Sequence, residues 1–259
     1  MNWREKLEKF LNDFKYKDDV IGVLACGSYI TGKPTSHSDL DVHIILKKDC
    51  DYRLRTTKFV DGLLIECFVN PADQIRKYMQ EDYNEIQQSS MNQFATGVIV
   101  RDDLGEVAKL KEEAKALLAK KFCDVDNSVS ELTKYAIWDM LDDLEDAYKE
   151  KKSDFDFIYY NNLNYLLSSV LKLYKYPYGK KVILGALTNL ALYKQKYSLS
   201  KFEDEDVGKL IIQSITAKSK KKRLNAFRDL ANLFWNRTGG FEINTFEFKS
   251  ATDTVSYTH

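Results

Sequence analysis

Hydrophobic residues follow two different patterns along this chain. Before residue 125, short apolar runs alternate with stretches in which apolar residues recur every three or four positions. The short runs predict buried strands, and the longer stretches predict amphipathic helices. After residue 125, nearly every apolar residue belongs to a helical stripe, which predicts a bundle of packed helices. The sequence therefore predicts two domains, over residues 1–125 and 126–259.

The first half is expected to contain both helices and strands. Helices are predicted over residues 3–16, 72–90 and 104–122. Strands are predicted over residues 20–28, where the apolar run ends in a turn, over residues 39–46 and over residues 96–103, and residues 57–70 predict a hairpin. The hairpin turns at Asp61-Gly62, a pair that favours tight two-residue turns.

Composition narrows the function mainly by exclusion. Lys and Arg number 39, as do Asp and Glu, so the formal net charge is zero and no global field attracts nucleic acid or an anionic membrane. No stretch approaches 18 uncharged apolar residues, so we expect no membrane partner. The four cysteines lack C-x-x-C spacing and the three histidines are scattered, which disfavours zinc. Free thiols and the absence of a signal-peptide pattern at the N-terminus favour a cytoplasmic location.

Residues 27–46, GSYITGKPTSHSDLDVHIIL, carry the strongest candidate chemistry. On a strand, Asp39, Asp41 and His43 project to one face, with the two aspartate Cβ atoms about 6–7 Å apart. Two unpaired carboxylates there would repel one another unless one took up a proton or both bound a cation. Mg²⁺ binds through a couple of carboxylates together with substrate phosphates. For His43, a core position is the simpler interpretation, and a place at the site is the alternative.

The flanking residues strengthen this interpretation. Gly27 permits a close backbone approach, and Ser28 offers a hydroxyl and an N–H to phosphate oxygens. Glu66 lies within the apolar run GLLIECFVN, where an acid is costly unless it meets a metal, a proton or a partner. If that strand lies beside residues 39–46, Glu66 joins the two aspartates. A D-x-D pair alone is commonly a solvated strand edge or a helix cap, so the prediction depends on the whole order of features.

Gly27-Ser28, ten intervening residues and Asp39-Leu40-Asp41 resemble the signature of the nucleotidyltransferase superfamily, which includes DNA polymerase β. Within that superfamily, the motif resembles the bacterial aminoglycoside and lincosamide adenylyltransferases. The resemblance covers roughly residues 20–120. It implies a mixed sheet flanked by helices, followed by a helical-bundle domain that binds the acceptor. It also implies two Mg²⁺ ions, a nucleoside triphosphate with ATP as the default, and transfer of a nucleoside monophosphate to a hydroxyl group.

The resemblance also implies roles for individual residues. Asp39 and Asp41 would hold the metal ions, and Glu66 would complete a metal site or deprotonate the acceptor hydroxyl. Ser28 would fix the terminal phosphates. Because relatives often supply a lysine from the helical half to the triphosphate, Lys180 and Lys181 are candidates for that role, with simple solvated charge as the alternative.

The acceptor is not fixed by the sequence. A small molecule is the leading expectation, and an aminoglycoside-type cation would suit the acidic face of one helix, formed by Asp139, Asp142, Asp143 and Asp146. A solvated helix face is the simpler explanation of those acids. Transfer to a protein or RNA is one alternative function, although neutral charge disfavours long RNA. A catalytically silent nucleotide-binding module is another, and a monomer and a homodimer are both compatible with the sequence.

Overall fold

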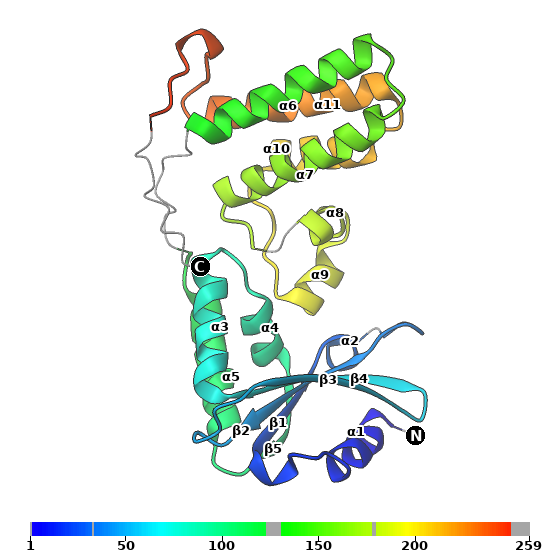
Figure 1. Ribbon diagram of the computed structural model, residues 1–259, viewed down its shortest axis with the longest axis vertical. Helices are drawn as coiled ribbons and strands as arrows, with labels where there is room; N and C mark the ends of the chain where they lie inside the picture. Colours follow the sequence, from blue (N-terminus) through cyan, green and yellow to red (C-terminus); the bar gives the residue numbers. More distant parts are fainter. Residues whose placement is uncertain (1, 33, 123–130, 178–179, 250–259) are drawn as a thin grey trace, which may run out of the picture. The chain divides into compact units, whose positions relative to one another are not determined.

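The computed structural model describes residues 2–32, 34–122, 131–177 and 180–249 (Figure 1). The chain forms two compact units, and each is described here by itself. The first comprises Met1–Cys123 and Pro177–Lys201, and the second comprises Asp124–Tyr176 and Phe202–His259. All strands in the described residues lie before residue 103, and the predicted boundary at residue 125 falls outside the described residues. However, Pro177–Lys201 pack with the first unit, which a simple division of the sequence into two halves does not include.

A five-stranded mixed sheet forms the centre of the first unit (Figure 1). The strands lie in the order β3-β4-β2-β1-β5. Their bounds are Val20–Cys26 for β1, Leu40–Leu46 for β2, Leu54–Val60 for β3, Leu63–Pro71 for β4 and Val98–Asp102 for β5. Strands β2 and β4 run parallel, whereas the other neighbours run antiparallel. The mixed sheet with flanking helices, followed by a helical region, confirms the predicted fold class.

Side chains of β2 point alternately to the two faces of the sheet, and each face packs against different helices. Its aliphatic residues at even positions, from Leu40 to Leu46, belong to the core beneath α1 (Trp3–Asn12). Its odd positions face the other side, where Ile45 packs with residues of three further helices. These helices are α3 (Ala72–Asn84), α4 (Ser89–Thr96) and α5 (Glu106–Ala119). Asp41 and His43 share the face of Ile45, so they project beside these helices and not beneath α1.

The local turns agree with the sequence in part. Asp61 and Gly62 both have positive φ values, 49° and 80°, and Val60 pairs with Leu63, which confirms the hairpin. Residues 72–90 form one helix and the start of another, because the chain turns at Ile86, whose φ is 56°. Residues after Gly27 form a short helix, α2 (Ser28–Thr31), and η1 (Lys17–Asp19) precedes β1.

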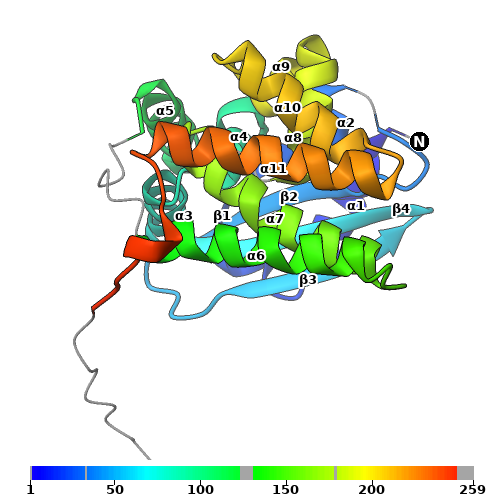
Figure 2. The same ribbon diagram turned by 90° about the horizontal axis from the view of Figure 1, so that it is seen from above.

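The second unit is helical in the described residues. It contains α6 (Glu131–Lys149), α7 (Phe155–Leu173), α10 (Glu205–Thr216), α11 (Lys220–Arg237) and η2 (Ile243–Thr245). Figure 2 shows α6 and α11 side by side. The apolar stripe over residues 183–191 belongs instead to α8 (Lys180–Thr188) and α9 (Leu190–Tyr197) of the first unit. Among the described helices, none combines the length and apolar content that a membrane crossing requires.

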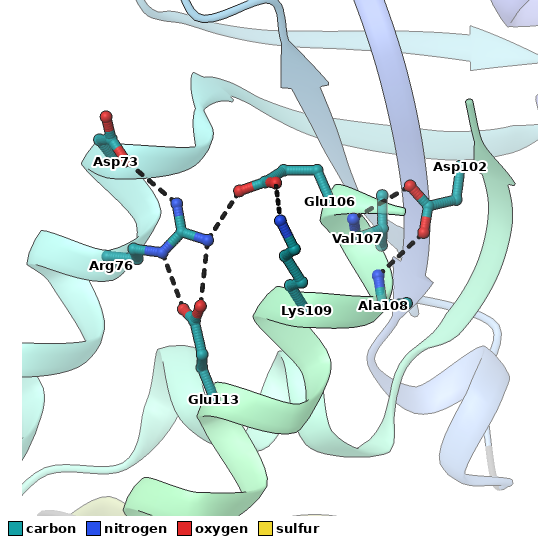
Figure 3. Close-up of polar contacts among 8 residues, drawn as sticks. All are labelled: Asp73, Arg76, Asp102, Glu106, Val107, Ala108, Lys109 and Glu113. Carbon is teal, nitrogen blue, oxygen red and sulfur yellow. Dashed lines mark hydrogen bonds and ion pairs between the residues drawn. The ribbon is translucent and has the colours of Figure 1, made fainter. Parts of the chain in front are cut away.

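Arg76 on α3 joins the helices on the site-bearing face of the sheet (Figure 3). Its guanidinium donates to both carboxylate oxygens of Glu113 at 2.8 and 3.0 Å, to Glu106 at 2.7 Å and to Asp73 at 3.0 Å. Hydrogen bonds to Glu113 are the largest cause of the raised pKa of Arg76. Asp102, at the end of β5, accepts from the N–H groups of Val107 and Ala108 in the first turn of α5. These contacts fix α3 and α5 against each other and against the sheet.

We expect Arg76→Met to lower the free energy of unfolding by about 1–3 kcal/mol, because two glutamates lose their shared partner. Arg76→Lys should lose less, since it keeps the charge but not the fork of donors. Urea denaturation measures both. The control is Lys77→Met, because the Lys77–Glu81 pair is exposed and 3.9 Å long. Equal stabilities for the Arg76 and Lys77 variants would contradict this account of the helix contact.

Candidate active site

Three carboxylates converge near the start of β2, where this strand pairs with β4. Asp39 directly precedes β2, and Asp41 is the direct neighbour of Glu66 in the parallel register of the two strands. Each of the three acids offers an oxygen, and these oxygens all lie within 4.8 Å of one another. The strand of Glu66 lies beside residues 39–46, which is the condition under which Glu66 joins the two aspartates. The group has the oxygen donors that a divalent cation requires.

The charge balance of this cluster is unfavourable without a cation. Burial, followed by the charges of Asp39 and Glu66, raises the pKa of Asp41 from 3.8 to about 6. The positive charges of Arg55 and Lys196 act in the opposite direction but do not cancel the effect. A divalent cation among the three acids would supply the missing positive charge. The residues present therefore fit a metal site.

Gly27 makes room for the carboxylate of Asp41. It has a φ of 76°, which side-chain-bearing residues rarely adopt. A Cβ atom at this position would lie 2.1 Å from Asp41 Oδ2, far inside contact distance. The Gly27 carbonyl accepts from the N–H groups of Ile30 and Thr31, so the chain turns immediately after the glycine. The glycine of the G-S pair thus has a steric role that is visible in the structure.

Arg55 on β3 is paired with Glu66. Its Nη2 and Nε lie 2.6 and 3.1 Å from Glu66 Oε1, and its guanidinium lies 4.9 Å from the ring centroid of Phe68. The Arg55 side chain is 68% exposed, so water screens the pair and its net contribution to stability is small. The sequence did not single out Arg55, because it precedes the predicted hairpin of residues 57–70. In the strand register Arg55 pairs with Phe68, and Thr57 is the residue opposite Glu66.

A cavity of about 370 Å³ opens beside the acids. The β1–α2 turn and the loop before β2 form one part of its lining, and uncharged polar residues of α4 form another. The end of α9 completes it. The lining residues are Gly27, Ser28, Thr31, His37, Ser38, Asp39, Asp41, Ser89, Asn92, Gln93, Thr96, Lys196 and Tyr197. Apart from the two aspartates and Lys196, this lining offers mostly hydroxyl and amide groups to a ligand.

Lys196 supplies the basic group of the cavity from the helical half of the sequence. It lines the cavity and lowers the pKa of Asp41 through its charge. Lys180 and Lys181 begin α8, but their side chains lie outside the described residues, so their role stays a prediction. The sequence did not single out Lys196, because α9 contains two lysines two positions apart and nothing local distinguishes them.

Hydrogen bonds from the first unit hold the end of α9 at the cavity. Asn92 on α4 donates to the Lys196 carbonyl at 3.2 Å, and Gln88 donates to the Tyr197 carbonyl at 2.9 Å. Gln195 donates to the carbonyl of Thr31 at 2.9 Å. These long-range contacts explain why residues 177–201 pack with the first unit. They also fix the backbone from which the Lys196 side chain projects.

His43 is a core residue that also contacts a cavity residue. It is 7% exposed, and its ring packs against Phe68 and Phe94 at centroid distances of 5.2 and 4.6 Å. Its Nε2 lies 3.1 Å from Gln93 Oε1. Burial lowers the pKa of His43 to about 4, so the ring is neutral at physiological pH.

The acidic face predicted to suit a cationic acceptor belongs to α6 of the second unit. Asp139, Asp142, Asp143 and Asp146 are exposed on that helix in the second unit, and they do not line the cavity described above. Their proposed contact with a cationic acceptor therefore stays a prediction.

Residues 6–123, just under half of the chain, match the family model described as "Nucleotidyltransferase domain". This segment contains Gly27, Ser28 and all three acids. No curated protein matches the chain. A similar solved structure is a nucleotidyltransferase-like protein from Exiguobacterium sibiricum 255-15, with 13% identity, a TM-score of 0.45 and coverage of 92% of this chain and 77% of that chain. The family match supports generic nucleotidyl transfer as the activity of the first unit.

We expect Asp41→Asn to stabilise the metal-free protein at pH 8 by about 1–2 kcal/mol, a value reduced for solvent screening. The folded protein holds the Asp41 proton up to about pH 6, whereas the unfolded chain releases it near 3.8. The wild type therefore loses stability as the pH rises through this window, and the variant does not. Denaturation at pH 4.5 and 8 measures the difference.

The exposed residue Asp51 provides the control, because Asp51→Asn removes the same charge outside the cluster. Adding Mg²⁺ should stabilise the wild type and not Asp41→Asn. An Asp41→Asn variant less stable than the wild type at pH 8 would contradict the electrostatic account.

Proposed function

We propose that this protein is a Mg²⁺-dependent nucleotidyltransferase that moves a nucleoside monophosphate from a nucleoside triphosphate, ATP by default, to a hydroxyl group of a small molecule. The observation that carries the proposal is the convergence of Asp39, Asp41 and Glu66 beside a polar cavity. These acids lie within the segment that matches a nucleotidyltransferase domain.

The acids have the chemistry that this reaction needs. Asp39 and Asp41 would hold two Mg²⁺ ions, and Glu66 would complete one metal site or accept the proton of the acceptor hydroxyl. Bound cations would neutralise the negative charge that develops on the phosphates. In the transfer, a bond forms between the acceptor oxygen and the α-phosphorus. The bond from that phosphorus to the bridging oxygen breaks, pyrophosphate leaves, and the acceptor proton passes to the base.

Residues across the cavity would bind the triphosphate. The Ser28 hydroxyl would donate to the terminal phosphates, and Gly27 would keep the adjacent wall free of side-chain atoms. The Lys196 ammonium group would offset phosphate charge, a role for which Lys180 and Lys181 also stay candidates. Because the Arg55 side chain is largely exposed, water screens its pair with Glu66, and the pair would be weak enough to exchange for a metal ion.

For the acceptor, we favour a small molecule, with an aminoglycoside-type antibiotic as one candidate. The formal net charge of zero disfavours a nucleic-acid acceptor, because such binding depends on basic residues that neutralise phosphates. A protein or RNA acceptor and a silent nucleotide-binding module are the alternative functions. The three converging acids favour an active enzyme over the silent module.

We expect Mg²⁺-dependent pyrophosphate release from a triphosphate when a suitable acceptor is present. Asp39→Ala and Asp41→Ala should each reduce it by about 10³-fold or more, because each removes a metal ligand. Glu66→Gln should reduce it by about 10²–10⁴-fold if Glu66 is the base. The assay is a coupled pyrophosphate measurement with a panel of hydroxyl acceptors and all four nucleoside triphosphates.

Asp49→Ala is the matched control, since Asp49 is an exposed aspartate of the loop after β2. Turnover that survives in Asp39→Ala or Asp41→Ala at the wild-type rate would exclude the proposed site. Nucleotide binding without turnover across the acceptor panel would favour the silent module instead.

Lys196→Met should raise the KM for the triphosphate by about tenfold, the loss of one charge-assisted contact of about 1.4 kcal/mol. Lys196→Arg should recover part of the loss because it keeps the charge. Lys194→Met is the control on the same helix, since Lys194 is exposed and does not line the cavity. Steady-state kinetics with varied triphosphate separates the two lysines, and equal KM values for both methionine variants would contradict a role for Lys196.

A further inference from the structure

Gln93 is a half-buried residue of α4 whose side chain lies between the cavity and the buried ring of His43. It is one of the cavity-lining residues, and its Oε1 lies 3.1 Å from His43 Nε2. The ring of His43 packs against Phe68 and Phe94, so it has a fixed orientation. A hydrogen bond therefore joins the buried ring of His43 to Gln93, a residue of the cavity wall.

The surroundings of the ring favour one proton position. His43 Nδ1 is buried and has no hydrogen-bond partner in the described part of the chain. A proton on Nδ1 would bury an N–H group without an acceptor, which is rarer in proteins than an acceptor without a donor. With the proton on Nε2, the ring donates to Gln93 Oε1. The Gln93 amide group is then held with its oxygen toward the ring.

This orientation leaves the amide N–H groups of Gln93 available for a ligand. Among the described residues, no acceptor contacts the Gln93 amide nitrogen, and three other uncharged polar residues of α4 line the same wall. His43 follows Asp41 by two positions on the same face of β2, a spacing of about 6–7 Å along a strand. Gln93, whose oxygen contacts His43, therefore packs on the same face of β2 from which Asp41 projects.

We propose that Gln93 binds an oxygen of the nucleoside triphosphate, at the phosphates or at the ribose, and that His43 is a positioning residue that holds the Gln93 amide in the donating orientation. This inference rests on the proposed function, because the nucleotide is the ligand that the neighbouring acids would bring to this wall through their metal. It assigns a role to a buried histidine and a glutamine that the D-x-D motif does not include.

The test is calorimetric binding of a non-hydrolysable ATP analogue with Mg²⁺. Gln93→Ala should weaken binding by about threefold to tenfold, the loss of one hydrogen bond. Gln93→Glu should weaken it more, because a further carboxylate would face the ligand oxygens. His43→Phe keeps an aromatic ring between Phe68 and Phe94 and should weaken binding about as much as Gln93→Ala. His43→Gln, which restores an amide donor toward Gln93, should recover part of the affinity.

A double-mutant cycle separates positioning from a merely structural role. If His43 acts through Gln93, the variant with both His43→Phe and Gln93→Ala should bind no more weakly than Gln93→Ala alone. Gln80→Glu is the control for the charge change, because Gln80 is exposed on α3. Additive losses, or unchanged affinity in Gln93→Ala, would overturn the inference.

Further arms identify the ligand oxygen and separate this inference from the proposed function. Inorganic triphosphate and adenosine, each tested alone with Mg²⁺, distinguish a phosphate contact from a ribose contact. If the nucleotide binds the wild type and Gln93→Ala with equal affinity, and the wild-type enzyme turns over, this inference alone is overturned. Wild-type protein that does not bind the analogue overturns the proposed function and this inference together.

Discussion

Parallel pairing of β2 with β4 is the constraint on which the candidate site depends. This register places Asp41 beside Glu66, and Asp39 follows because it directly precedes β2. A slip of one residue would turn Glu66 to the face beneath α1, where β4 contributes Ile65 and Cys67 to the core. The aliphatic residues of both strands therefore help to fix the position of the acids, because a slip of one residue would expose the core and bury the charges.

Other parts of the first unit surround the three acids. Gly27 leaves the space that the Asp41 carboxylate occupies, and α4 contributes hydroxyl and amide groups to the cavity wall. The return of residues 177–201 to this unit adds Lys196, held by the bond from Asn92 to its carbonyl. The site is thus built from one local motif and two distant segments whose positions are set by side-chain-to-backbone hydrogen bonds.

This construction explains how far the sequence could predict the site. Local patterns were sufficient for the hairpin at Asp61-Gly62, for the shared face of Asp39 and Asp41, and for Glu66 as a costly acid in an apolar strand. Local patterns could not identify Lys196, because the contacts that place it join residues more than 100 positions apart. They also could not show that α8 and α9 leave the helical half, since an apolar stripe records burial and not the partner that buries it.

The pairing of Arg55 with Glu66 shows how the fold accommodates three acids in one place. One carboxylate has an arginine, and another, Asp41, has a raised pKa and so a greater tendency to hold a proton. Both solutions are reversible, because the arginine is largely exposed and a proton exchanges with a metal ion as the pH rises. A tighter solution, such as a buried arginine bonded to all three acids, would stabilise the fold but would compete with the cation. The weak compensation at this cluster is therefore what a metal-binding site requires and what a purely structural charge network, such as that of Arg76, does not show.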